Sequence, residues 1–193
     1  MTDLEAANRA LMLLGVAPIG SLSDSHQAAR VMNAQLPNAK RTVLNEFPFN
    51  FALRIEPLTP AGGSVAGYAH VFAKPSSALN VQRVYSNTDF RGVAEFRVVG
   101  NLIAANIEGG SVEYTAFVSD LNTWPQHVQE CLVTRLASDA AVSLTGDGNL
   151  MQAMLQKYMT LASHAAEVSV VEENVPPMRR ADYSPRGYVE ARQ

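Results

Sequence analysis

The chain has 193 residues, of which 47% are hydrophobic, a mean hydropathy of −0.02 and a formal net charge of −3. These values fit one globular domain with a sizeable core, and no apolar run reaches the ~18 residues that span a bilayer. The chain starts with the polar and acidic residues Thr2, Asp3 and Glu5, and we therefore expect no secretory signal peptide. Cys131 is the single cysteine, so no intrachain disulfide can form. We expect it to be a small buried hydrophobe in a protein made in a reducing cytosol.

The first predicted helix spans residues 3–14. Thr2 and Glu5 are spaced as a capping box at its start, and Gly15 is placed to end it. Apolar residues recur along it at helical spacing and predict one buried face. They are Leu4, Ala7, Leu11 and Leu14.

The second predicted helix spans residues 25–46, with Ser23 or Asp24 as its N-cap. Pro37 falls inside this pattern and is expected to kink or split the helix. Pro48 is expected to close it. An aromatic cluster that we expect in the core follows: Phe47, Pro48, Phe49, Asn50, Phe51 and Ala52.

Residues 64–118 change to the alternating pattern typical of strands. Gly100-Asn101 lies between two apolar pairs and predicts a two-residue hairpin turn, and Glu108-Gly109-Gly110 predicts another turn. We therefore expect an antiparallel β insertion of three to five strands in a helical domain. The candidate strands are 68–73, 80–85, 94–99, 102–106 and 112–118.

Two further helices are predicted at residues 125–145 and 150–167. Thr123 is a plausible N-cap for the first, with Pro125 in its first turn. The run from Gly146 to Asn149 is expected to stop this helix and to cap the next one.

These elements predict an α+β fold that is mainly α: a bundle of about four helices with an antiparallel β-sheet insertion and an extended C-terminal tail. We expect one domain over residues 1–175, with helices within 3–60 and 120–170 and the β insertion at 64–118. Residues 176–193, called the arm below, begin with Pro-Pro and show neither helical nor strand periodicity.

The charges are distributed unevenly along the chain. Residues 119–175 hold seven acidic and two basic residues, whereas the arm holds four arginines and two acidic residues. One interpretation is a solvated acidic helix face followed by an unstructured end. The other is an arm that pairs with an acidic groove on a neighbouring molecule.

The sequence offers little catalytic or ligand-binding chemistry. His127 and Cys131 are spaced i,i+4 on one predicted helix, but two ligands are too few for a zinc site. There is no nucleophile elbow, no phosphate-binding loop and no dinucleotide fingerprint. We therefore expect no enzyme activity, no cofactor and no metal, and a chain that is not basic does not favour specific DNA readout.

Several short motifs follow one another in a characteristic order. They are Asn8-Arg9-Ala10-Leu11, Leu14 to Ile19, Ser21-Leu22-Ser23-Asp24, Ala29-Arg30, Leu44, Phe47 to Ala52, Tyr114, Ala137 to Ala141 and Leu144-Thr145-Gly146. In this order, over nearly the whole chain, they resemble the tail tubular protein A family of short-tailed bacteriophages, the adaptor ring below the portal. Phe49 stands where a tryptophan is expected in that family.

The resemblance implies a structural virion protein, a helical bundle with a β insertion assembled as a dodecameric ring. Its partners would be the portal protein on one face, the tail nozzle protein on the other and further copies of itself. DNA would pass through the lumen during packaging, retention and ejection without sequence-specific binding, and no membrane would be involved. The protein would act in the neck of the virion after synthesis in the cytoplasm of the bacterial host.

Under this hypothesis the helices build the ring body, and the β insertion makes subunit or nozzle contacts. The arm extends onto the portal, with its arginines paired to acidic groups and its tyrosines as anchors, because Tyr and Arg are typical interface anchors. The candidate portal-interface residues are Arg179, Arg180, Tyr183, Arg186 and Tyr188.

Three alternatives remain at this stage. The first is a head-completion or connector protein of a longer-tailed phage. The second is a cytoplasmic enzyme or ligand-binding module, which would have a deep pocket with convergent polar groups and shifted pKa values. The third is a nucleic-acid-binding regulator, which would need a basic face.

Overall fold

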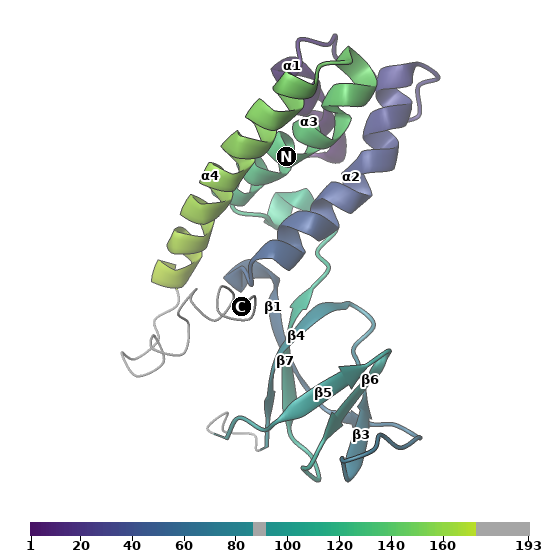
Figure 1. Ribbon diagram of the computed structural model, residues 1–193, viewed down its shortest axis with the longest axis vertical. Coiled ribbons are helices and arrows are strands. Elements are labelled where there is room, and N and C mark those ends of the chain that lie inside the picture. The colour runs from purple at the N-terminus through teal and green to yellow at the C-terminus, as the bar shows by residue number, and fades with distance from the viewer. Residues whose placement is uncertain (87–91, 173–193) are drawn as a thin grey trace.

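The protein has a helical end and a sheet end (Figure 1). The computed structural model describes residues 1–86 and 92–172. This part of the chain contains four α-helices: α1 (Asp3–Leu13), α2 (Gln27–Glu46), α3 (Gln126–Thr145) and α4 (Gly148–Glu172). Two antiparallel sheets lie between α2 and α3 in the chain. The fold is therefore α+β and mainly α, as predicted.

Helices α1 and α3 run side by side in the same direction. The ammonium group of Met1 donates to Oδ1 of Asn122 (3.1 Å). Eight residues later in both segments, the guanidinium of Arg9 lies 2.5 Å from the carboxylate of Glu130. Figure 1 shows α2 and α4 running back along this pair toward the sheets. The two return helices thus both end near the sheet end of the molecule.

The bundle encloses one apolar core, to which all four helices contribute. Cys131 is fully buried in this core, as the sequence predicted. Its largest fully buried side chains are Leu11, Met32, Leu44, Leu121, Leu132, Leu136 and Tyr158.

The first two helices differ in how well their ends were predicted. The Thr2–Glu5 capping box of α1 is present, and Gly15 follows the helix with a φ of +69°. The predicted side-chain cap of α2 is wrong, because the carboxylate of Asp24 accepts from the backbone N–H of Ser21 instead (2.9 Å). The N-cap of α2 is His26, without a side-chain bond.

Pro37 does not split α2, which runs unbroken from Gln27 to Glu46. A proline removes the N–H that would bond the carbonyl four residues earlier. Here that carbonyl belongs to Asn33, and both residues are exposed, so water can replace the missing donor.

The predicted starts and ends of the last two helices need correction. Thr123 is not the N-cap of α3, because residues 121–123 form a short 3-10 turn and Pro125 is the N-cap. Gly146 ends α3 with a φ of +71°, as predicted, and Asp147 caps α4 by accepting from the N–H groups of Asn149 and Leu150. Helix α4 extends to residue 172, beyond the predicted 167, and its last turns pack at the sheet end.

The β insertion begins earlier than predicted. Residues 53–60 were expected within the helical region, but they form β1 (Leu53–Pro57) and β2 (Thr59–Pro60). The described chain holds seven strands rather than three to five. The reason is long-range pairing: β1 aligns with the last strand of the insertion, Leu53 opposite Thr115, which no local pattern reveals.

The remaining strands are β3 (His70–Ala73), β4 (Ala78–Tyr85), β5 (Phe96–Val99), β6 (Leu102–Ala105) and β7 (Ser111–Ala116). One sheet has the order β1-β7-β4 and the other β2-β3-β6-β5. The predicted turn at Gly100-Asn101 joins β5 to β6, where Gly100 has a φ of +59°. A second apolar core lies between the two sheets, and its members are Leu58, Phe72, Val84, Ile103, Ala105, Val112, Tyr114 and Ala116.

Gly110 lies at a close approach of two backbone segments in the sheet end. Its φ is +151°, and its carbonyl accepts from the N–H of Leu58 (2.9 Å). A Cβ placed on Gly110 would lie 1.8 Å from the carbonyl oxygen of Tyr85. The chain leaving β4 and the chain entering β7 therefore leave no room for a side chain here.

Replacing Gly110 with alanine is expected to lower the free energy of unfolding by about 3 kcal/mol or more, because backbone would have to move to admit the methyl group. Gly109 is the matched control, since a Cβ there meets nothing within 4 Å. Gly109→Ala should change stability by no more than about 0.5 kcal/mol. Urea unfolding followed by circular dichroism measures both, and equal midpoints for the two variants would contradict the packing argument.

Candidate functional site

Both connections between the helical bundle and the sheets pass through one region, which we call the junction: residues 47–53 and 117–125. The first segment leaves α2 and becomes β1, and the second leaves β7 and leads to α3. Since β1 and β7 pair directly, the two segments cross side by side. The junction sets how the sheets are oriented relative to the bundle, and we take it as the candidate functional site.

A row of aromatic rings fills the junction. Ring centroids are 5.5 Å apart for Phe47 and Phe49, 6.0 Å for Phe49 and Phe51, and 5.5 Å for Phe51 and Trp124. The indole N–H of Trp124 donates to the carbonyl of Val118 (3.2 Å). Phe49 is buried and its two aromatic neighbours are half-buried, so the predicted core position of this cluster is confirmed in its centre. The rings join the first segment to the second.

Lys40 secures the second segment to two helices. Its ammonium group lies 2.8 and 2.9 Å from the two carboxylate oxygens of Asp3 and 2.8 Å from the carbonyl of Ser119. The Lys40 side chain is only 6% exposed, so these three acceptors replace most of its water. The neighbouring Arg41 places its guanidinium over the Phe117 ring, 4.5 Å from the centroid.

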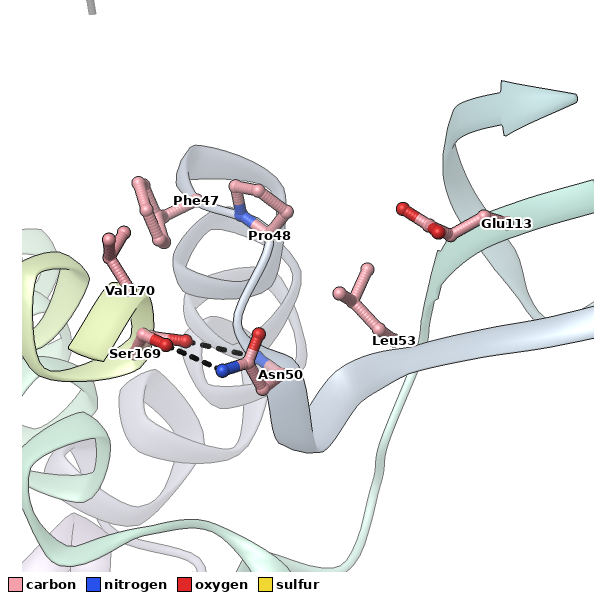
Figure 2. Close-up of a pocket in the computed structure, with 7 residues that line it drawn as sticks. All are labelled: Phe47, Pro48, Asn50, Leu53, Glu113, Ser169 and Val170. Atoms are coloured by element: carbon pink, nitrogen blue, oxygen red, sulfur yellow. Dashed lines mark hydrogen bonds between the residues drawn. The ribbon is translucent and has the colours of Figure 1, made fainter. Parts of the chain in front are cut away.

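The end of α4 is bonded to the first segment. The backbone N–H of Asn50 donates to Oγ of Ser169 (3.1 Å), and its side-chain amide donates to the Ser169 carbonyl (2.5 Å). Beside these bonds lies a small pocket, which we call the junction pocket (Figure 2). Its lining residues are Phe47, Pro48, Asn50, Leu53, Glu113, Ser169 and Val170.

Glu113 forms the sheet-side wall of the junction pocket. It is 8% exposed, accepts from the Tyr85 hydroxyl at 2.6 Å and lies 3.6 Å from the guanidinium of Arg83. Burial raises the pKa of Tyr85 above its ordinary value, and the hydrogen bond to Glu113 adds to this. The pocket thus combines apolar walls with one buried carboxylate.

A second buried tyrosine belongs to the helical bundle. The Tyr158 hydroxyl donates to Glu46 at the end of α2, and its ring lies under the guanidinium of Arg135, which also bonds Asp139 (3.0 Å). Burial raises the pKa of Tyr158 strongly, and Glu46 adds to this. A hydroxyl that stays protonated and bonded here joins α4 to α2, while the ring contacts Arg135 of α3.

Reactive and metal-binding groups are scarce. Within residues 1–86 and 92–172, no three His, Cys, Asp or Glu side chains are grouped to hold a metal ion. His127 and Cys131 meet through the backbone, since the thiol donates to the His127 carbonyl (3.2 Å). Burial raises the pKa of Cys131 to about 11. In the same described ranges, none of the helices combines the length and the apolar character needed to cross a membrane.

Large apolar side chains are exposed at several places on the surface. Val98 and Val99 are 39% and 42% exposed on β5, the outermost strand of its sheet. The others are Met12, Ile55, Val93, Val142 and Met159. Such side chains are available for contacts with other protein molecules, although singly exposed apolar residues are common on protein surfaces.

The portal-interface residues predicted from the sequence lie outside the described part of the chain. They are Arg179, Arg180, Tyr183, Arg186 and Tyr188. Sequence reasoning missed the functional role of Asn50 in the junction and of three polar residues that lie against it, namely Lys40, Glu113 and Ser169. One signal was available: Lys40 follows Ala39 and precedes Val43 on the buried face of α2, where a charged residue needs a partner.

Comparison with known proteins assigns no family to the chain. A scan against protein-family models gives no match, and a search of curated proteins gives none either. The functional interpretation therefore uses the sequence pattern and the geometry described above.

Replacing Lys40 with alanine is expected to lower the free energy of unfolding by about 1–3 kcal/mol, because the Ser119 carbonyl and the Asp3 carboxylate lose the donor that the buried lysine supplies. Arg30→Ala is the control, since it removes one positive charge from an exposed position of the same helix. Chemical unfolding monitored by Trp124 fluorescence reports on the junction directly. Equal losses in both variants would show that net charge, and not the buried contact, is responsible.

The Cys131 thiol is expected to resist modification in the folded protein. The thiolate is the reactive form, and a pKa of about 11 leaves almost none of it near neutral pH. An aromatic disulfide reagent should therefore label the thiol only after unfolding in guanidinium. Rapid labelling of the native protein would contradict the burial of this side chain.

The same pKa shift predicts alkaline destabilisation. Because the folded pKa is raised, its contribution to stability is complete below the unfolded value of about 9 and is lost as pH rises toward 11. Cys131→Ala should lose less stability over this interval than the unmodified protein, in parallel unfolding titrations.

Proposed function

We propose that this protein is a structural head-to-tail adaptor of a short-tailed bacteriophage, forming a dodecameric ring between the portal and the tail nozzle. The observation that carries the proposal is the agreement between the ordered sequence motifs and the architecture. The resemblance implies a helical bundle with a β insertion, and the protein has four helices with antiparallel strands between the second and the third. The proposal concerns a structural protein, whose activity is assembly.

The junction supports a mechanical role. A ring that joins two other assemblies has to transmit load between its helical and sheet ends without letting them swing. Two hydrogen-bonded strands, an aromatic row and the buried Lys40 cross the junction together. Such a connection keeps two binding surfaces at a constant relative orientation, which a closed ring of identical contacts requires.

The surface chemistry is compatible with ring contacts. A stable interface buries about 1,200–2,000 Å² in total, and neighbours in a closed ring use two different surfaces of each copy. Exposed apolar side chains occur on both ends, for example Met12 and Val142 on the bundle and Val98 on the sheets. These residues are the first candidates for subunit and nozzle contacts.

The acidic helical half fits a channel lining, because phosphates bind to Lys and Arg and would slow on a basic wall. Two of its acids are already paired within the chain, Glu130 with Arg9 and Asp139 with Arg135. In each pair the arginine is matched by a carboxylate, so neither pair adds an unpaired positive charge. DNA would then pass without being held.

The decisive measurement is the mass of the protein in solution, alone and after mixing with the portal protein encoded by the same genome. We expect a complex whose mass exceeds that of the portal ring by about twelve copies of this chain, which follows from the proposed ring and is measured by light scattering on a sizing column. A monomer that never comigrates with the portal would refute the proposal and favour a ligand-binding function instead.

Arm variants assign the portal contact. Tyr183→Ala combined with Tyr188→Ala, and separately Arg179→Ser with Arg180→Ser, should each weaken portal binding by roughly thirtyfold or more, as for interface anchors. Arg192→Ser is the matched control and should bind as the unmodified protein does. Equal binding by all variants would remove the arm from the interface.

A further inference from the structure

We propose that neighbouring copies of the chain join edge to edge, with β1 of one copy pairing antiparallel with β5 of the next and Ile55 opposite Val98. This rests on the proposed ring and names its subunit contact, because neighbours in a closed ring use two different surfaces of each copy. β1 is an edge strand of one sheet, and β5 is an edge strand of the other. Both strands lie within the described part of the chain.

The two sheets have four edge strands, and two of these are poorly suited to pairing with another molecule. β2 has two residues, one of which is Pro60. β4 has register irregularities along its pairing with β7, and its far end is already covered, because the N–H of Ala94 bonds the Val84 carbonyl (2.8 Å). Short strands, prolines and bulges are features that protect sheet edges from other chains. The edges of β1 and β5 remain.

The edge of β5 that faces away from β6 is open. Ala94, just before β5, points its N–H toward this side, where it bonds Val84. Because every second residue of a strand points its backbone groups to the same side, those of Phe96 and Val98 point there as well. No strand within residues 1–86 and 92–172 pairs with this side at Phe96 or Val98. Val98 also has an exposed side chain, so the edge combines available backbone groups with an apolar surface.

β1 has a matching edge on the side away from β7. The N–H of Leu58 bonds the Gly110 carbonyl (2.9 Å) and continues the β1–β7 register. In antiparallel pairs every second residue bonds the partner strand, so Ile55 points its N–H and C=O to the open side. Its side chain is exposed as well. Pro57, two residues later, offers a carbonyl but no N–H, which limits this edge to a short stretch around Ile55.

Side-chain charges select the register. With Ile55 opposite Val98 of the next copy, two exposed β-branched side chains meet, and Glu56 lies directly opposite Arg97. Opposite charges and β-branched pairs across two strands are stabilising, whereas like charges directly opposite are destabilising. Sliding the strands by two residues is the smallest shift that keeps the hydrogen bonds. In one direction this shift places Glu56 opposite Glu95, and in the other it leaves Glu56 and Arg97 without a charged partner.

Both charged groups are available for this contact. Arg97 is exposed, and in the described part of the chain it forms no ion pair. Glu56 is exposed too, and its Oε1 accepts from the Tyr114 hydroxyl (2.6 Å). This bond orients the carboxylate and leaves Oε2 for the guanidinium of the neighbouring copy.

Disulfide crosslinking of the full-length protein tests the pairing. A chain with Ile55→Cys and Val98→Cys should form a ladder of linked oligomers beyond the dimer, because each copy offers a different strand to each neighbour. Opposite residues of such a pair have Cα atoms about 5.5 Å apart, within disulfide range. Ile55→Cys with Val142→Cys is the matched control, since it uses an exposed valine of the bundle, and should form no ladder. The native Cys131 is buried and does not compete.

The single variants distinguish other pairings. Dimers of Val98→Cys alone in equal yield would show β5 pairing with β5, which refutes the proposal. Absence of a ladder both in the free protein and in its mixture with the portal would overturn it as well, and a complex with the portal in that experiment would leave the adaptor function standing. A ladder from a protein that never binds the portal would support the strand pairing and refute the adaptor function.

Charge reversal tests the register. In the Ile55→Cys, Val98→Cys chain, Arg97→Glu should lower the equilibrium fraction of linked chains in a glutathione buffer roughly fivefold, because two carboxylates then lie opposite each other. Adding Glu56→Lys should restore linkage, since the pair is then reversed. Arg30→Glu makes the same change of charge at an exposed position of α2 and is the control. Equal losses from Arg97→Glu and Arg30→Glu would show that the register is wrong.

Discussion

The pairing of β1 with β7 is the interaction on which the rest of the structure depends. It places the strand that leaves the helical bundle beside the strand that returns to it, with Leu53 opposite Thr115 at the edge nearest the helices. A single covalent connection would let the sheets swing, whereas two hydrogen-bonded strands resist bending and twisting together. This pairing limits the orientations that the sheets can take relative to the bundle, and the other contacts of the junction restrict these orientations further.

Apolar burial and directional contacts have different roles in this structure. The bundle and the sheets have separate apolar cores, so burial stabilises each end largely by itself. Orientation between the ends comes from directional contacts: the ring pair Phe51–Trp124, the Lys40–Ser119 bond and the Asn50–Ser169 pair. Apolar burial is non-directional, whereas hydrogen bonds and stacked rings tolerate few geometries, and this makes them suited to setting an angle.

The Asn50–Ser169 contact connects the end of α4 to the segment that leads into the sheets. Ser169 belongs to the last turns of α4, and Asn50 belongs to the segment that becomes β1. A partner that binds beyond α4 would therefore act next to the point where the sheets are attached. In the proposed ring, portal binding beyond α4 would then affect the junction directly, and the junction orients the sheets that would face the nozzle. No chain of contacts through the whole bundle would be needed.

The sequence by itself determined the fold class, the four helices, the hairpin at Gly100-Asn101 and the burial of Cys131, because these follow from local periodicity, capping and turn chemistry. The tertiary structure decided that residues 53–60 are strands, since their partners lie far along the chain. It also decided that Lys40 bonds Ser119 in the junction and that Asn50, Glu113 and Ser169 line one pocket. Periodicity assigns a residue to a face of its own element, but only packing decides which faces meet, and burial of a polar group becomes favourable only when its partner arrives from elsewhere.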